Sequence, residues 1–301
     1  MPDTLLAAHV TDIHYPVPSC FHLRDLMSKR ITGAVNLLVS SRRSFRPHLL
    51  KSLLTHLRSI GVSHLLITGD LVNLAYPEEY LRLRTHLEES GFAPDQVSMV
   101  PGNHDAYLPE AVKQEIFWEN LGPYAWAAGP RDYPVVRAVG PIEIVGISTA
   151  LPTPLGMAYG EVGAEQLQRL EAILLRKTDR FRVVLIHHSP SPGVDTWHDG
   201  LVDGAQLRRL FWKYGADLIL HGHEHKDLER RIDGPGGSQI PVLGTGCAIL
   251  DDPRPSMRAR ARLFRFGDGG LERSWMIVHD SASGHWKSPS GVQIPDSPAG
   301  V

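Results

Sequence analysis

Five short polar motifs occur along the chain, and each of them follows directly after a run of apolar residues. In order they are Asp12-Ile13-His14, Gly69-Asp70, Gly102-Asn103-His104-Asp105, His187-His188 and Gly222-His223-Glu224-His225. Strand ends are where an α/β sheet presents its reactive groups, so these side chains are expected to converge. Their side chains include two carboxylates, Asp12 and Asp70, one amide oxygen and four imidazoles that could bind metal, with His104 left over. This is the ligand inventory of two adjacent transition-metal ions.

Such a pair of ions has a characteristic chemistry. Two cations about 3.5–4 Å apart can hold a bridging hydroxide, neutralise a phosphate and stabilise charge on the attacking and leaving oxygens. Mixed imidazole and oxygen ligands suit Mn, Fe or Zn better than Mg or Ca. Two divalent ions against Asp12, Asp70 and a hydroxide leave about +1, which favours an anionic phosphodiester. The constellation therefore predicts a metal-dependent phosphoesterase.

The spacing within the motifs suggests how the ligands are shared. In an extended chain residues i and i+2 point the same way, so Asp12 and His14 are expected to reach one metal. The same argument applies to His223 and His225. Asp70 follows an apolar run and a glycine that lets the backbone turn sharply, and it is the natural candidate to bridge both ions.

The elements that must position these motifs can be read from the apolar periodicity. Strands are expected over Leu5–Val10, His64–Thr68, Val97–Val100, Ile142–Ser148, Arg182–Ile186, Asp217–Leu220 and Pro241–Thr245. Helices are expected over Arg46–Ile60, Pro77–Ser90, Ala164–Arg176 and Gly204–Tyr214. This alternation favours a largely parallel sheet covered by helices. Two later runs, Arg260–Phe266 and Leu271–Val278, predict a closing antiparallel pair.

The chain is expected to form one domain over residues 1–280, followed by a disordered tail over 281–301 that is rich in Ser, Pro and Gly. The segment 15–47 is a basic, amphipathic insertion in which Asp25 is the single acid. One interpretation is a helical insertion whose charged face is solvated. The other is a basic lid beside the metal site that attracts a phosphorylated substrate or a membrane surface.

Composition narrows the class of protein further. The chain has 301 residues and a formal net charge of −2, which gives no global reason to expect nucleic acid as a partner. Its two cysteines, Cys20 and Cys247, are far apart and cannot form a disulfide framework, so a reducing cytoplasm is the default. The N-terminal apolar run predicts a strand rather than a signal peptide. No apolar stretch approaches the ~18 residues of a membrane span.

Motif for motif, the chain resembles the calcineurin-like metallophosphoesterase superfamily. The resemblance implies a four-layer αββα sandwich, an α/β fold with two mixed β-sheets flanked by helices. It also implies the ligand sets: Asp12, His14 and His225 on one ion, Asp70 as the bridge, and Asn103, His187 and His223 on the other.

The resemblance implies a catalytic role for the remaining histidine. His104 would contact the phosphate or the leaving oxygen, as a general acid or charge stabiliser, and Asp105 would orient it. Asn103 and His104 would thus both lie against the substrate. Asn73 stands where many relatives carry a second aspartate, which leaves the role of that acid open.

Three histidines near the motifs need separate interpretation. His187 is preferred over His188 as a ligand, because His187-His188-Ser189-Pro190 resembles the His-His-Pro-Pro of relatives, in which the first histidine binds metal. His188 would then support the site or face the substrate. His9 and His221 are expected to be structural histidines within strands.

Among members of the superfamily, compact bacterial phosphodiesterases of the class III cyclic-nucleotide or glycerophosphodiester type resemble this chain most. Protein Ser/Thr phosphatases continue Gly-Asp with Asp-Arg-Gly, whereas here Leu71-Val72-Asn73 follows. We therefore expect hydrolysis of a small or lipid-derived phosphodiester, such as a cyclic nucleotide, by a metal-bridging hydroxide. No stable nucleic-acid partner is expected, and the sequence predicts no oligomeric state.

Two alternatives remain at this stage. One is a membrane-associated hydrolase of a lipid pyrophosphate or phosphoester, which would dock through residues 15–47. The other is a non-catalytic scaffold that keeps the fold, although every ligand position expected of an active member is filled here.

Overall fold

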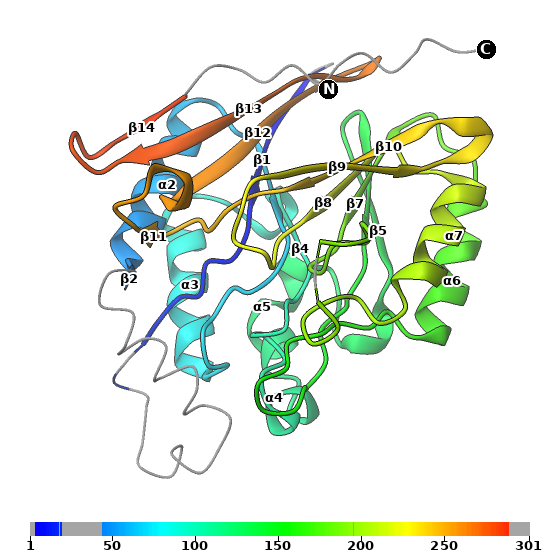
Figure 1. Cartoon of the computed structure of the whole chain (residues 1–301). Helices are drawn as coiled ribbons and strands as arrows, with labels where there is room; N and C mark the ends of the chain where they lie inside the picture. Colours follow the sequence, from blue (N-terminus) through cyan, green and yellow to red (C-terminus); the bar gives the residue numbers. More distant parts are fainter. Residues whose placement is uncertain (1–3, 18, 20–43, 195, 289–301) are drawn as a thin grey trace.

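The computed structural model describes residues 4–17, 19, 44–194 and 196–288, which form two six-stranded sheets packed face to face (Figure 1). From edge to edge, the first sheet contains β14 (His285–Lys287), β13 (Gly270–Asp280), β12 (Arg260–Gly267), β1 (Leu5–Val10), β3 (His64–Ile67) and β4 (Val97–Met99). The second contains β5 (Val135–Val139), β6 (Ile142–Gly146), β7 (Phe181–Leu185), β8 (Leu218–His221), β10 (Gln239–Gly244) and β9 (Leu228–Asp233). A separate short pair joins β2 (Ser44–Phe45) to β11 (Leu250–Asp251).

Helices cover both outer faces of this double sheet. The first sheet is flanked by α2 (Pro47–Ser59), α3 (Pro77–Glu89) and α5 (Ile116–Ala125), with the short α4 (Pro109–Lys113) preceding α5. The second is flanked by α6 (Ala164–Leu174) and α7 (Gly204–Tyr214), on the right in Figure 1. The expected four-layer αββα sandwich is confirmed.

The sequence explains why these helices lie where they do. α2 begins with Pro47 in its first turn, where a missing N–H costs nothing. Its leucines recur at helical spacing and all are buried: Leu49, Leu50, Leu53, Leu54 and Leu57. One apolar stripe therefore attaches α2 to the first sheet.

The central parallel strands β7 and β8 of the second sheet are buried on both faces, as parallel strands between two layers must be. In β7, Val183 and Leu185 face the core between the sheets, whereas Val184 and the following Ile186 pack with Phe211 of α7. This alternation follows from the two-residue period of a strand.

The two sheets present their strand ends on the same side. β1, β3 and β4 are parallel to one another, and so are β7 and β8. The N–H of Gly222, after β8, donates to the carbonyl of His187, after β7. All five polar motifs therefore lie in loops at the carboxyl ends of these strands.

The chain end differs from the prediction. Residues 285–287 are not part of a disordered tail, because β14 pairs with β13 and the Trp286 indole donates a hydrogen bond to Ser52 Oγ at 3.0 Å. Residues 289–301 lie outside the described part of the chain. Residues 18 and 20–43, which include Cys20 and make up most of the predicted basic insertion, also lie outside the described part.

Some elements had no prediction, among them β5, α4 and α5. None of the helices in the described residues is long and apolar enough to cross a membrane.

Candidate metal centre

The carboxyl ends of five strands bring the predicted ligands into one cluster at the junction of the sheets. Two hydrogen bonds tie the sheets together there. The N–H of His223 donates to Asp12 Oδ2 at 3.1 Å, and His187 Nδ1 donates to the carbonyl of Thr68 at 2.7 Å. The loops of the first and second sheet thus hold one another in place.

A first group of side chains consists of Asp12, His14, Asp70 and His225, whose ligand atoms all lie within 4.8 Å of one another. His14 Nε2 lies 3.0 Å from His225 Nε2. Asp12 Oδ1 lies 3.3 Å from His225 Nε2, and Asp70 Oδ2 lies 3.5 Å from His14 Nε2. All four atoms therefore surround one small volume.

A second group gathers around the side-chain oxygen of Asn103. Asn103 Oδ1 lies 3.0 Å from His187 Nε2 and 3.1 Å from His223 Nδ1. Asp70 Oδ1 lies 3.4 Å from the same His187 nitrogen. Asp70 consequently turns one carboxylate oxygen toward each group, as a bridging ligand would.

The protonation pattern of His187 tests whether these residues fit a cation. Its Nδ1 must donate, because its partner is the Thr68 carbonyl, so Nε2 of the neutral ring carries a lone pair. That lone pair faces two further acceptors, Asn103 Oδ1 and Asp70 Oδ1, in a fully buried position. Ligand atoms at about 2.0–2.1 Å from an ion lie roughly 3–3.5 Å apart, so the group fits a metal.

Charge in the cluster is consistent with this fit. Burial lowers the pKa of His14 and of His223, which keeps both imidazoles neutral, as ligands must be. Burial also opposes ionisation of Asp12, but the nearby His225 and His187 together lower the pKa of Asp12 to about 2. Burial disfavours a charged His187, yet Asp70 raises the pKa of His187 to about 9, so a bound cation would displace a proton from its Nε2. Ionised carboxylates here attract positive charge.

The backbone at the cluster is unusual. Positive φ angles occur at Asp12 (50°), His14 (44°), Asp70 (51°), His223 (75°) and His225 (54°). Non-glycine residues rarely adopt this conformation, and it concentrates at functional sites. The expectation of an extended chain at Asp-x-His and His-x-His was therefore wrong, since β1 and β8 end before these motifs. His223 and His225 lie in different groups.

Gly102 is required by close packing around Asp70. A Cβ atom on Gly102 would lie 2.3 Å from Asp70 Oδ1 and 2.8 Å from His187 Cε1. Only glycine leaves room for the carboxylate and the imidazole together.

His104 lies beside the first group and is partly exposed. Its Nδ1 donates to the backbone carbonyl of Asn73 at 2.7 Å. Its ring meets that of His14 edge-on, with centroids 4.5 Å apart, and stacks on Tyr107. The other ring nitrogen, Nε2, has no hydrogen-bond partner in the described part of the chain.

Asp105 does not orient His104, contrary to expectation. Its carboxylate accepts hydrogen bonds from the N–H groups of Gly102 (2.8 Å), Leu71 (3.2 Å) and Val72 (3.4 Å). Burial, with the Asp70 charge adding to it, raises the pKa of Asp105 to about 8. The motif aspartate thus joins the loops that carry Asp70 and Asn103, because several N–H groups in those loops need an acceptor.

His188 lies close to the cluster, but both of its ring nitrogens already have hydrogen-bond partners. Its Nε2 donates to the Ala158 carbonyl at 2.9 Å, and its Nδ1 accepts from Thr149 Oγ1 at 2.7 Å. Its ring centroid is nevertheless 4.4 Å from that of His223. This arrangement supports His187 as the ligand and places His188 in support of His223.

The other two histidines lie inside the fold. His9 is held between Thr68 and Thr245 through both ring nitrogens. His221 is fully buried and pairs with Glu224 at 3.0 Å.

Several contacts of the site had no sequence signal. The carbonyls of Thr68 and Asn73 orient His187 and His104, and backbone groups carry no residue signature. Phe45 places its ring centroid 4.9 Å from that of His14. Burial raises the pKa of the Cys247 thiol, and the nearby His225 opposes this shift.

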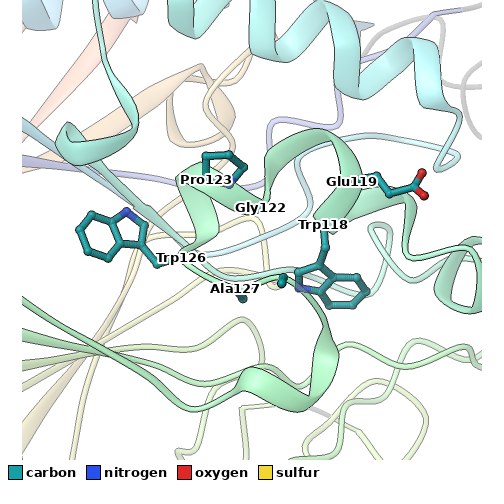
Figure 2. Close-up of a pocket in the computed structure, with 7 residues that line it drawn as sticks. Trp118, Glu119, Gly122, Pro123, Trp126 and Ala127 are labelled. Carbon is teal, nitrogen blue, oxygen red and sulfur yellow. The ribbon is translucent and has the colours of Figure 1, made fainter.

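A separate surface hollow of about 400 Å³ lies along α5 (Figure 2). Its lining contains the aromatic rings of Trp118 and Trp126 and one charged group, Glu119. None of the clustered ligands lines it, so it lacks the groups for phosphoester chemistry.

Comparisons with known proteins agree with this geometry. The sequence profile described as calcineurin-like phosphoesterase matches residues 5–227. A probable cyclic nucleotide phosphodiesterase of Vesicomyosocius okutanii is 25% identical over 60% of this chain and 70% of its own length. Another, of Psychrobacter sp., is 23% identical over 72% of this chain and 64% of its own length. A dimetal phosphatase from Danio rerio shares the fold, with a TM-score of 0.63, 12% identity and coverage of 94% and 95%.

Proposed function

Because the chain belongs to the calcineurin-like phosphoesterase family, we propose that this metal-dependent phosphoesterase is a phosphodiesterase acting on a small phosphodiester, a cyclic nucleotide being the first candidate. The observation that carries the proposal is the position of Asp70 between two groups of ligand atoms. Asp12, His14 and His225 would share one ion with Asp70, and Asn103, His187 and His223 would share the other. Mixed nitrogen and oxygen donors favour Mn, Fe or Zn.

When bound, the two ions supply Lewis acidity that polarises the phosphoryl group and lowers the pKa of water. The protein holds the ligand side chains in position. Asp70 and Asn103 sit on loops held by Asp105, and His187 is held by the Thr68 carbonyl. The ligand atoms are therefore in place before a substrate arrives, so little reorganisation is needed.

His104 has the geometry of a group that acts on the leaving oxygen. The Asn73 carbonyl holds its Nδ1–H and the Tyr107 ring supports one face, so Nε2 is the atom presented outward. In the protonated ring, Nε2 can give a proton to the departing alkoxide, and the positive charge stabilises the phosphoryl oxygens before that.

Two observations favour a diester over a monoester. The relatives from Vesicomyosocius and Psychrobacter are named as probable cyclic nucleotide phosphodiesterases. In addition, two carboxylates and the attacking hydroxide would leave two divalent ions with a net charge of about +1, which matches a singly charged diester.

The test is hydrolysis of bis(p-nitrophenyl) phosphate beside p-nitrophenyl phosphate, with Mn²⁺ added and then removed by a chelator. We expect metal-dependent cleavage of the diester, slowed in His104→Ala. Faster cleavage of the monoester would redirect the assignment to a phosphatase. No cleavage of either ester by protein with two bound ions would overturn the proposal and favour a scaffold.

A further inference from the structure

A second cavity lies beside the metal centre and has no role in the chemistry described above. It has a volume of about 240 Å³ and is lined by Ser189, Ser191, Pro192, Gly193, Thr196, Trp197, Gly200, Leu201 and Arg208. One of its lining residues, Ser189, follows the proposed ligand His187 by two residues. A group attached to a phosphate in the metal centre could therefore extend into it.

His188 connects this cavity to the proposed ligands. The carbonyl of Ala158 accepts the His188 Nε2–H, and the N–H of Ala158 donates to the His198 carbonyl at 2.8 Å. Gly160, two residues after Ala158, packs so closely against His188 that a Cβ atom there would lie 2.2 Å from His188 Nδ1. On its other side, the His188 ring lies against His223. The cavity wall and the metal centre thus share one rigid support.

Two polar groups in the wall are suited to a ligand. Ser191 is only 7% exposed, and its Oγ is a buried atom with no hydrogen-bond partner in the described part of the chain. Buried hydroxyls are normally paired, so this orphan indicates a partner that the protein itself does not supply. Arg208 donates from Nη1 to the Pro190 carbonyl at 2.9 Å, which fixes its guanidinium in the wall with further donors to offer.

The rim of the cavity carries an aromatic platform. Trp197 is 79% exposed, and its ring stacks on that of His198 with centroids 5.0 Å apart and an interplanar angle of 24°. An indole supported on one side and open on the other is suited to stacking with a planar ring. Base–aromatic stacking of this kind tolerates different bases and needs no hydrogen-bond readout.

We propose that this cavity binds the nucleoside part of the substrate, with its base stacked on Trp197 and polar atoms of the nucleoside bonded to Ser191 and Arg208. The proposal rests on the proposed function in one respect, namely that the phosphodiester itself lies in the metal centre. It assigns a nucleotide, rather than a ring-free glycerophosphodiester, as the class of substrate.

The kinetic test compares a diester with a base, cyclic AMP, and one without a ring, glycerophosphoethanolamine. In Trp197→Ala, we expect KM for cyclic AMP to rise about ten-fold or more with kcat little changed. Trp197→Phe should restore most of the loss, and KM for the ring-free diester should not move. Trp212→Ala is the matched control, because Trp212 is 61% exposed on α7 and does not line the cavity.

A binding test separates this proposal from the proposed function. Adenosine has no phosphate, so its binding does not depend on the metal centre. Its binding is measured by calorimetry, with ribose as the ligand that lacks a base. Adenosine should bind wild-type protein and Trp212→Ala, and bind Ser191→Ala and Trp197→Ala more weakly. Such binding without hydrolysis of any diester would support the cavity and overturn only the proposed function. Absence of adenosine binding, or equal binding by Trp197→Ala, would overturn the nucleoside cavity.

Discussion

Asp70 Oδ1 lies 3.4 Å from His187 Nε2, although the two residues belong to different sheets. Asp70 follows β3 of the first sheet, and His187 follows β7 of the second. In a neutral His187, which donates through Nδ1, the lone pair of Nε2 faces the ionised carboxylate, and neither atom can donate to the other. Their approach in a buried position is that expected of two ligands of one cation, and so binding of metal should hold the sheets together.

Replacing the bridging carboxylate should therefore weaken both ions at once. In Asp70→Asn the side-chain volume stays nearly the same, but one group loses an oxygen donor and the groups of His14 and of His187 both lose the negative charge. We expect the metal content to fall for both sites and kcat to fall at least about 100-fold. Metal analysis of the purified protein by mass spectrometry measures this. Retention of one full equivalent would show that another group bridges.

His104 should be needed for turnover but not for metal. In His104→Ala we expect unchanged metal content and a fall in kcat of about 10²–10⁴, the usual contribution of a positioned acid. The loss should be smaller for p-nitrophenyl leaving groups, which need little protonation, than for an alkyl diester. Loss of an ion from this variant would place His104 among the ligands instead.

Asp105 should act on stability through the backbone. Asp105→Ala leaves the N–H groups of Gly102 and Leu71 unpaired in a buried site, which should lower the free energy of unfolding by about 3 kcal/mol. Urea unfolding of the metal-loaded protein measures the change. The pH dependence of kcat should keep its shape in this variant, whereas a shifted profile would restore the idea that Asp105 orients His104.

Gly102 should be intolerant of any side chain. In Gly102→Ala the new Cβ would lie 2.3 Å from Asp70 Oδ1, so the carboxylate must move and metal affinity should fall at least about ten-fold. Gly269→Ala is the control, since nothing lies within 4 Å of a Cβ at that position. Isothermal titration with Mn²⁺ compares them. Equal affinity in both variants would mean that the loop relaxes freely.

A buried histidine far from the ligands should make the protein sensitive to acid. Burial, with Arg137 adding to it, lowers the pKa of His64 from 6.5 to about 3. The unfolded chain therefore binds a proton at His64 below about pH 6.5, whereas the folded protein binds it only near pH 3. Because the unfolded state binds more protons in this window, the free energy of unfolding falls as pH falls through it. By pH 5 the loss is about 2 kcal/mol.

Urea unfolding at pH 7 and pH 5 measures this effect. In His64→Gln, which can keep a hydrogen bond to Ser98, the drop in stability between the two pH values should be smaller than in wild type by that amount. An identical drop in both proteins would show that His64 already protonates in the folded state.

The elements close to the site were predictable because their signals are local. β1 and α7 have the bounds that apolar periodicity indicates, and both faces of β7 are apolar as a covered parallel strand requires. β14 was missed because its burial depends on Ser52, more than two hundred positions away in the chain. A short segment rich in small and polar residues carries no periodic signal of such a contact.

The sequence by itself determined the kinds of ligand and the strand ends that carry them, because residue type and apolar periodicity are written directly in the chain. Only the tertiary structure decided how those ligands are grouped. His223 and His225 are two residues apart, yet left-handed backbone angles direct them to different groups. Asp105 could have bonded a histidine or a backbone, and the choice depended on which N–H groups the loops left unpaired.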